Sequence, residues 1–202
     1  MLASFAALGG ARAIADPDTE PFSHKGQFGL SVRTALGLRA IATYDEAVYC
    51  GATDASVTTG NAPVCLARSP MSLNLEASYG ATARIDVLVE LRIGLETDFG
   101  ATPGSSNGPR MLFLSPGARF FFNEATRSSL FATAQAVFDF SGYKDASGSR
   151  RATDLGFRNL LGYWLDLHKA YGMYVFAGDT ATFSRWIRLE LELGIGFQGR
   201  YP

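Results

Sequence analysis

Residues 187–201, close to the end of the chain, read IRLELELGIGFQGRY. Apolar residues and one glycine occupy the odd positions from Ile187 to Tyr201, whereas the even positions carry charged residues, glycine and glutamine. Alternation with a period of two predicts a β-strand with one apolar and one polar face. The stretch is also much longer than the usual globular strand of about five or six residues. Such a long terminal strand is typical of the closing strand of a transmembrane β-barrel.

The composition is compatible with this interpretation. The 202 residues are enough for one β-barrel domain. A net charge of −1 lacks the basic footprint of a nucleic-acid-binding protein, so we expect no nucleic-acid partner. Although 47% of the residues are hydrophobic, no run of about twenty apolar residues predicts a transmembrane helix. The hydrophobicity must therefore lie in alternating strands.

Seven further segments show strand patterns, which gives eight strands in all. The connections between them alternate between long and short. An even number of antiparallel strands with long loops at one end and short turns at the other is typical of outer-membrane barrels. We therefore predict an all-β, eight-stranded antiparallel up-and-down transmembrane β-barrel over residues 26–201, with both chain ends in the periplasm. The other seven strands are predicted at 26–44, 71–79, 85–99, 111–122, 130–140, 154–167 and 173–178, and the long extracellular loops at 46–70, 100–110, 142–153 and 179–186.

The N-terminal residues 1–15 form an apolar segment that ends in Ala13-Ile14-Ala15, which matches a signal-peptidase cleavage site. The positively charged start of a signal peptide is missing, so a frayed apolar tail is the alternative. We predict that residues 1–15 are the remnant of a signal peptide. Residues 16–25 contain two prolines and no periodicity, which predicts a short periplasmic lead-in.

Charged residues share one face of each clear strand. A basic residue facing lipid at the bilayer midplane costs roughly 2–4 kcal/mol, so the charged faces should point into the barrel. The interior of an eight-stranded barrel is just wide enough to be filled by side chains. We therefore predict a network of ion pairs that fills the lumen, formed by Arg33, Arg39, Glu76, Glu90, Arg92, Glu96, Arg119, Asp139, Arg158, Asp166, Arg188, Glu190 and Glu192.

A soluble lipocalin-like barrel has the same alternation with the faces exchanged, so that the charges meet water and the apolar face lines a ligand cavity. Three features favour the membrane barrel. Both terminal strands exceed the 9–11 residues that cross a bilayer. The charged faces mix both signs with small residues, which suits a narrow interior. Aromatic residues gather near the predicted strand ends, as in interfacial girdles.

In strand count, face pattern, loop asymmetry and the aromatic Tyr201, residues 26–201 resemble the small eight-stranded outer-membrane barrels of the OmpA and OmpX type. Gly196 stands five residues before Tyr201, as in the assembly signal of such barrels, but Ile195 replaces the expected polar residue and Pro202 follows the aromatic. The resemblance implies location in the outer membrane of a Gram-negative bacterium. The implied partners are lipid, lipopolysaccharide and the barrel-assembly machinery. We expect a monomer without cofactor or metal.

Cys50 and Cys65 are the only cysteines, and both lie in the predicted loop 46–70. An exported protein meets an oxidising compartment, so this pair predicts a disulfide bond, with two free thiols as the alternative. No histidine lies near them to complete a metal site.

Some barrels of this size are lipid A deacylases with a His-x-Ser-Asn motif. Here Ser106-Asn107 is present, but Gly104 occupies the histidine position. His24 and His168 are predicted on the opposite side of the membrane, where neither can act as a base for a serine. We therefore predict no enzymatic activity. We expect a structural or adhesive role through the surface loops, with a narrow porin-like channel for ions or small solutes as the alternative. A soluble lipid-binding barrel and a lipid A-modifying enzyme are less favoured.

Overall fold

The computed structural model describes residues 22–42, 48–49, 61–62, 64–97, 110–124, 126–141, 153–183 and 187–202. Within these ranges the secondary structure is antiparallel β. No helix found there has the length and hydrophobicity to cross a membrane. The strands are β1 (Phe28–Ala42), β2 (Val48–Tyr49), β3 (Asn61–Ala62), β4 (Val64–Arg68), β5 (Ser72–Gly80), β6 (Ile85–Thr97), β7 (Arg110–Phe121), β8 (Ser128–Asp139), β9 (Asp154–His168), β10 (Tyr171–Thr182) and β11 (Ile187–Tyr201).

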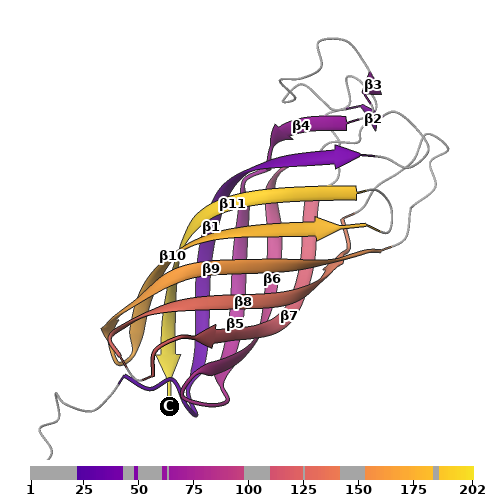
Figure 1. Ribbon diagram of the computed structural model, residues 1–202. Coiled ribbons are helices and arrows are strands. Elements are labelled where there is room, and N and C mark those ends of the chain that lie inside the picture. Colours follow the sequence, from indigo (N-terminus) through magenta and orange to yellow (C-terminus); the bar gives the residue numbers. More distant parts are fainter. Residues whose placement is uncertain are drawn as a thin grey trace, which may run out of the picture.

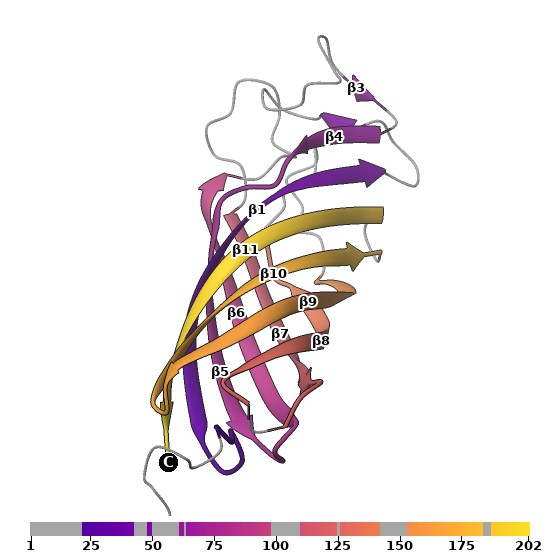
Figure 2. The ribbon, with the colours of Figure 1, turned by 60° about the vertical axis from the view of Figure 1, so that its left-hand side comes forward.

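The wall is a closed barrel (Figures 1 and 2). Strands β5 to β11 pair in chain order, and β1 lies between β5 and β11. β1 pairs with β11 along its whole length, from Phe28 opposite Tyr201 to Ala42 opposite Ile187. Closure leaves the eight-stranded wall without the free edge that an open sheet would expose. The predicted fold class, an eight-stranded antiparallel barrel, is confirmed.

The second wall strand is built from two pieces, β4 and β5, which both pair with β1. Ser72 lies opposite Ala35 and Arg68 lies opposite Leu38, so three residues of the β4–β5 strand face two residues of β1. Pro70 lies in this irregular stretch, where its missing N–H costs no ladder hydrogen bond. The segment predicted as loop 46–70 thus contains β4 and the short β2–β3 pair. Five residues are too few for a period of two to be recognised in the sequence.

β10 is longer than its pattern indicates. Residues 173–178 were predicted as the strand and 179–186 as a loop, whereas the structure continues the strand to Thr182. Pairing with β9 on one side and β11 on the other holds residues 179–182 in the wall. Residues 1–21, 98–109 and 142–152, with the predicted signal peptide and most of two predicted loops, lie outside the described residues.

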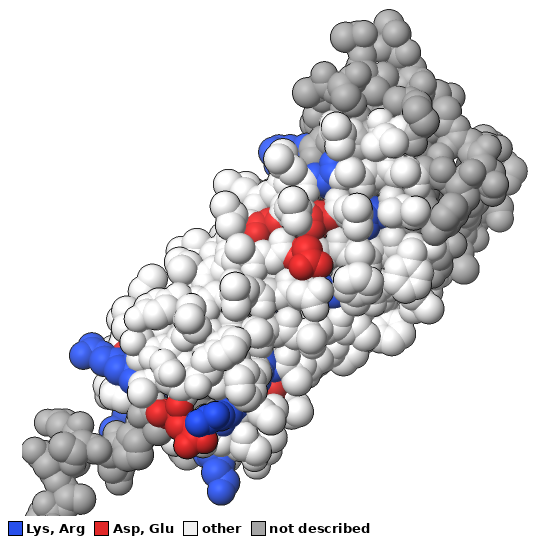
Figure 3. Space-filling view, in the orientation of Figure 1, with Lys and Arg blue, Asp and Glu red and all other residues white. Residues whose placement is uncertain are grey.

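The two faces of the wall have opposite chemistry. On β11, Arg188, Glu190 and Glu192 are buried inside, whereas Leu191 and Leu193 are 67% and 68% exposed on the outside. Space-filling atoms along the wall are largely uncharged, with charged groups of both signs near the lower end and again in the upper half (Figure 3). A soluble barrel with charges outside would show the reverse arrangement, so the structure excludes that alternative.

Candidate functional site in the barrel interior

The barrel interior is filled by charged side chains from the inward positions of the wall strands. Because desolvation of an ion is costly, each buried charge needs a partner inside. The buried charged residues of the strands are Arg33, Arg39, Arg92, Arg119, Arg158, Arg188, Arg200, Glu76, Asp86, Glu90, Asp139, Asp154, Asp166, Glu190 and Glu192.

In the upper part of this interior, Arg92 of β6 lies between two carboxylates of β11. Its guanidinium nitrogens lie 3.1 Å from Glu190 Oε2 and 3.2 Å from Glu192 Oε2. Arg188 is also paired with Glu190, at 2.8 Å. Because β1 and β5 stand between β6 and β11 in the wall, the bonds of Arg92 cross the lumen.

At mid-height, Glu90 of β6 accepts ion pairs from Arg33 of β1 and Arg158 of β9. Gln135 donates a further hydrogen bond to Glu90 Oε2 at 3.0 Å. Nε of Arg158 lies 2.9 Å from Glu192 Oε1, which joins this group to the upper one. β7 and β8 separate β6 from β9, so Arg158 also bridges the interior.

Below these pairs, Glu76 of β5 binds Arg119 of β7. One guanidinium nitrogen of Arg119 lies 2.8 Å from both carboxylate oxygens of Glu76. The Arg119 guanidinium carbon lies between 5.2 and 5.4 Å from the ring centres of Phe131, Trp164 and Tyr174, which is within cation–π range. The Arg119 guanidinium is therefore in contact with the Glu76 carboxylate and with three aromatic rings.

The lower end of the interior contains His24, a residue of the lead-in. His24 Nε2 lies 3.2 Å from Asp166 Oδ2, and Trp164 Nε1 donates to Asp166 Oδ1 at 2.8 Å. Two residues further along the chain, Gly26 donates its N–H to the Gly80 carbonyl at 2.7 Å. Burial lowers the pKa of His24, and Asp166 and Asp86 only partly offset this effect. The folded environment therefore disfavours the protonated imidazole.

Twelve of the thirteen predicted lumen residues are buried in the interior. The exception is Glu96, whose side chain is 41% exposed and lies 2.8 Å from Arg68, outside the buried network. Asp86, Asp154 and Arg200, which the prediction omitted, are also buried in the interior, and Arg200 lies 3.5 Å from Asp86. The sequence could have identified these three residues, because each stands at an even position, on the same face as the predicted inward residues of its own strand. His24 carried no such signal, since it precedes the first strand.

Several predicted features lie outside the described residues. Cys50 and the side chain of Cys65 are among them, so the disulfide stays a prediction. Ser106, Asn107 and Gly104 are outside as well. In the described part of the chain, no group of three or more His, Cys, Asp or Glu residues is arranged to hold a metal ion. The interior contacts that the structure describes include guanidinium–carboxylate pairs, hydrogen bonds and cation–π contacts.

No protein-family model and no curated protein sequence matches the chain. Solved structures do match. Neisserial surface protein A superposes with a TM-score of 0.57 at 12% identity, over 88% of this chain and 100% of that one. The N-terminal β-barrel domain of Pseudomonas aeruginosa OprF gives 0.53 at 9% identity, over 88% and 100%. The outer membrane protein OprG from Pseudomonas aeruginosa gives 0.50 at 9% identity, over 90% and 99%.

Identities this low show a shared fold and nothing finer. The closed register of eight wall strands and these superpositions agree with each other. The chain thus has the fold of the small eight-stranded outer-membrane β-barrels.

Proposed function

We propose that this chain is a bacterial outer-membrane barrel with a sealed interior and a structural or surface-interaction role carried by its long loops. The supporting observation is the set of ion pairs that cross the lumen. Arg92 joins β6 to β11, and Arg158 joins β9 to β6, so bonds run between nearly opposite sides of the barrel. A solute would have to break these bonds to pass.

The exterior supports placement in a membrane. Leu38, Leu193 and Leu36 on β1 and β11 are each more than 60% exposed, and similar residues cover the other strands. In water this surface would be unfavourable by roughly 25 cal/mol per Å². At the lower end, Phe28, Tyr171 and Tyr201 are exposed in the positions of an interfacial aromatic girdle.

In this proposal the lower end faces the periplasm, and the expected partners are outer-membrane lipid, lipopolysaccharide and, during insertion, the barrel-assembly machinery. The proposed role includes no catalysis, since the deacylase-like Ser106-Asn107 lacks its histidine.

A narrow channel is the second candidate, and one observation favours it. Some buried polar atoms have no hydrogen-bond partner in the described part of the protein, among them Asn74 Nδ2, Thr133 Oγ1 and Thr180 Oγ1. Buried polar groups of this kind are normally satisfied by ordered water. Water at these positions would give a small ion a partial path beside the arginines.

Conductance in planar bilayers distinguishes the two candidates. Purified protein is reconstituted after a heat-modifiability gel has shown that it is folded, and flotation with outer-membrane fractions tests the location. The sealed barrel predicts no single-channel steps for the wild-type protein. Single-channel steps in the wild-type protein would contradict the seal. Loss of those steps when Arg92 or Arg158 is replaced by lysine would favour the channel. Failure to float would contradict the membrane placement itself.

A further inference from the structure

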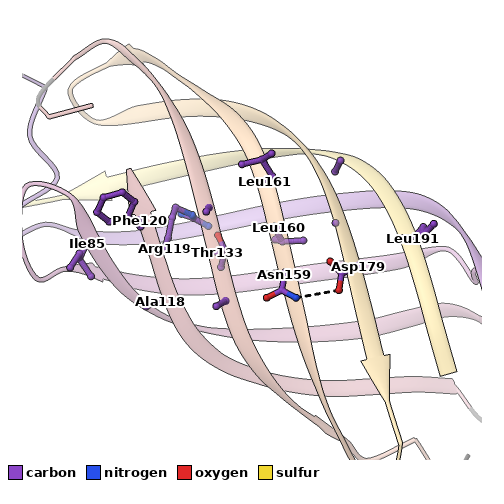
Figure 4. A pocket seen from close by; sticks show the side chains of 14 residues that line it. Ile85, Ala118, Arg119, Phe120, Thr133, Asn159, Leu160, Leu161, Asp179 and Leu191 are labelled. Atoms are coloured by element: carbon purple, nitrogen blue, oxygen red, sulfur yellow. Dashed lines mark hydrogen bonds between the residues drawn. The ribbon is translucent and has the colours of Figure 1, made fainter. Parts of the chain in front are cut away.

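A polar pair interrupts the apolar outer face of the wall. Asn159 of β9 and Asp179 of β10 lie opposite each other in register, and Asn159 Nδ2 donates to Asp179 Oδ2 at 3.2 Å (Figure 4). Both occupy outward positions, because their neighbours Arg158 and Thr180 are buried inside. Asp179 is thus a carboxylate on the side of the wall that meets lipid.

The pair lies within the apolar band and not at its rim. On the outward face of β9, the exposed residues Leu155 and Phe157 stand on one side of Asn159, and Leu161 and Tyr163 stand on the other. A carboxylate at such a depth is costly unless a cation or further hydrogen-bond donors reach it. The partner of Asp179 within the described residues is the neutral amide of Asn159.

A shallow hollow of about 740 Å³ adjoins the pair on the outer wall. Its floor consists of small residues, and larger side chains such as Phe120 and Leu161 border it (Figure 4). Ala118, Ala134, Asn159 and Asp179 follow one another across β7, β8, β9 and β10 in register. With strands about 4.8 Å apart, this row is about 14 Å long and ends at the carboxylate.

We propose that this hollow binds a straight-chain alkyl ammonium amphiphile, with the alkyl chain on the alanine floor and the ammonium group on Asp179. Charge complementarity selects the head group, because Asp179 lacks a cation among the described residues. The volume is that of a small-ligand pocket. A second copy of the chain fits less well, since a two-fold contact would bring two Asp179 carboxylates together in hydrocarbon.

The proposal rests on the membrane placement and is independent of whether the lumen is sealed. Native mass spectrometry of the full chain in a non-ionic detergent tests it, with octadecylammonium as the probe and octadecanol and butylammonium as comparisons. A charge-assisted hydrogen bond predicts that octadecylammonium binds about tenfold more tightly than octadecanol, at one molecule per chain. Butylammonium lacks the chain and should bind more weakly than octadecylammonium.

Two variants separate the head-group contact from the chain contact. Asp179→Asn keeps the size of the side chain and should abolish the preference for octadecylammonium over octadecanol. Ala134→Phe fills the floor and should weaken binding of both long-chain probes. The matched controls are Ala136→Phe, at the next outward position of β8 outside the hollow, and Glu124→Gln in an exposed turn. Neither control should change binding.

The same spectra contain the outcomes that overturn the proposal. Retention of the preference in Asp179→Asn would show that the carboxylate does not hold the head group. Equal effects of Ala134→Phe and Ala136→Phe would show that the hollow does not hold the chain. A dimer that disappears in Ala134→Phe would assign the hollow to a second copy instead. Heat-modifiability gels identify any variant that fails to fold.

Discussion

His24 Nε2 lies 3.2 Å from Asp166 Oδ2 although the two residues are 142 positions apart in the sequence. The pair ties the lead-in, which precedes the first strand, to the interior of β9. The ring of His24 also packs edge-on against Phe121 and Trp164, with centroid distances of 4.6 and 5.6 Å. His24, in the part of the lead-in that the structure describes, is therefore packed into the folded barrel at its lower end.

We predict that this histidine makes the barrel less stable in mild acid. Burial lowers the pKa of His24 in the folded state, so the unfolded chain takes up the proton first as the pH falls. Stability should therefore decrease as the pH drops below about 6.5, and this contribution should level off below the folded-state pKa. Asp166 and Asp86 face the ring and favour the proton, whereas Arg200 opposes it. Urea midpoints of the detergent-solubilised barrel between pH 8 and pH 5 measure the effect.

His24→Gln is the matched control, because glutamine can donate to Asp166 but does not titrate in this range. The variant should lose the part of the pH dependence that His24 causes. An identical slope in wild type and variant would assign the effect to other groups.

Removal of Arg92 should destabilise the barrel. Arg92→Ala leaves Glu190 and Glu192 with Arg188 and Arg158 as remaining partners, and we expect a loss of about 3 kcal/mol in the free energy of unfolding. The exposed pair Arg68–Glu96 provides the control, since Arg68→Ala should cost less than about 1 kcal/mol. Unfolding in urea, followed by heat-modifiability gels, gives both values. Equal losses would argue against a buried network.

Glycine is required at position 194, where β11 passes close to the backbone of β1 and to a ring of β10. A Cβ at Gly194 would lie 2.5 Å from the Thr34 carbonyl oxygen and would overlap the ring of Phe176. Gly194→Ala should therefore destabilise the barrel by about 1–3 kcal/mol. On the same strand, a Cβ at Gly199 meets nothing within 4 Å, so Gly199→Ala should leave the urea midpoint nearly unchanged. A reversed order of the two variants would contradict the observed packing.

The predicted disulfide between Cys50 and Cys65 is testable by mass. Alkylation of the unfolded, unreduced protein purified from the outer membrane should add no label, whereas reduction should allow two labels. Two labels without reduction would show free thiols. Cys65 lies in β4, opposite Ile41 of β1, whereas the pairing of β1 with β5 and β11 involves neither cysteine. Loss of the bond should therefore affect the β4 end of the wall and the loop before it more than the rest of the barrel.

Much of the fold was predictable because alternation is a local property. The alternation at Leu189, Glu190 and Leu191 already distinguishes the outer face from the inner face. The number of segments with this alternation gives the number of wall strands. The pattern was weak at the ends of strands. β4 is too short to show a period, and Asp179 looked like a loop residue because its strand shows polar residues on both faces there.

The partners inside the lumen were decided by tertiary structure. Periodicity places Arg158 and Glu90 on inward faces, but which carboxylate meets which guanidinium depends on barrel closure and on the register of strands that are distant in sequence. The same holds for His24, which reaches Asp166 only because the lead-in turns into the lower end. The sequence by itself determined the two faces of the wall, since side chains alternate along any strand. Only the closed barrel determined which charged side chains meet across the lumen. These contacts depend on the distances between strands in space and not on the order of the strands along the chain.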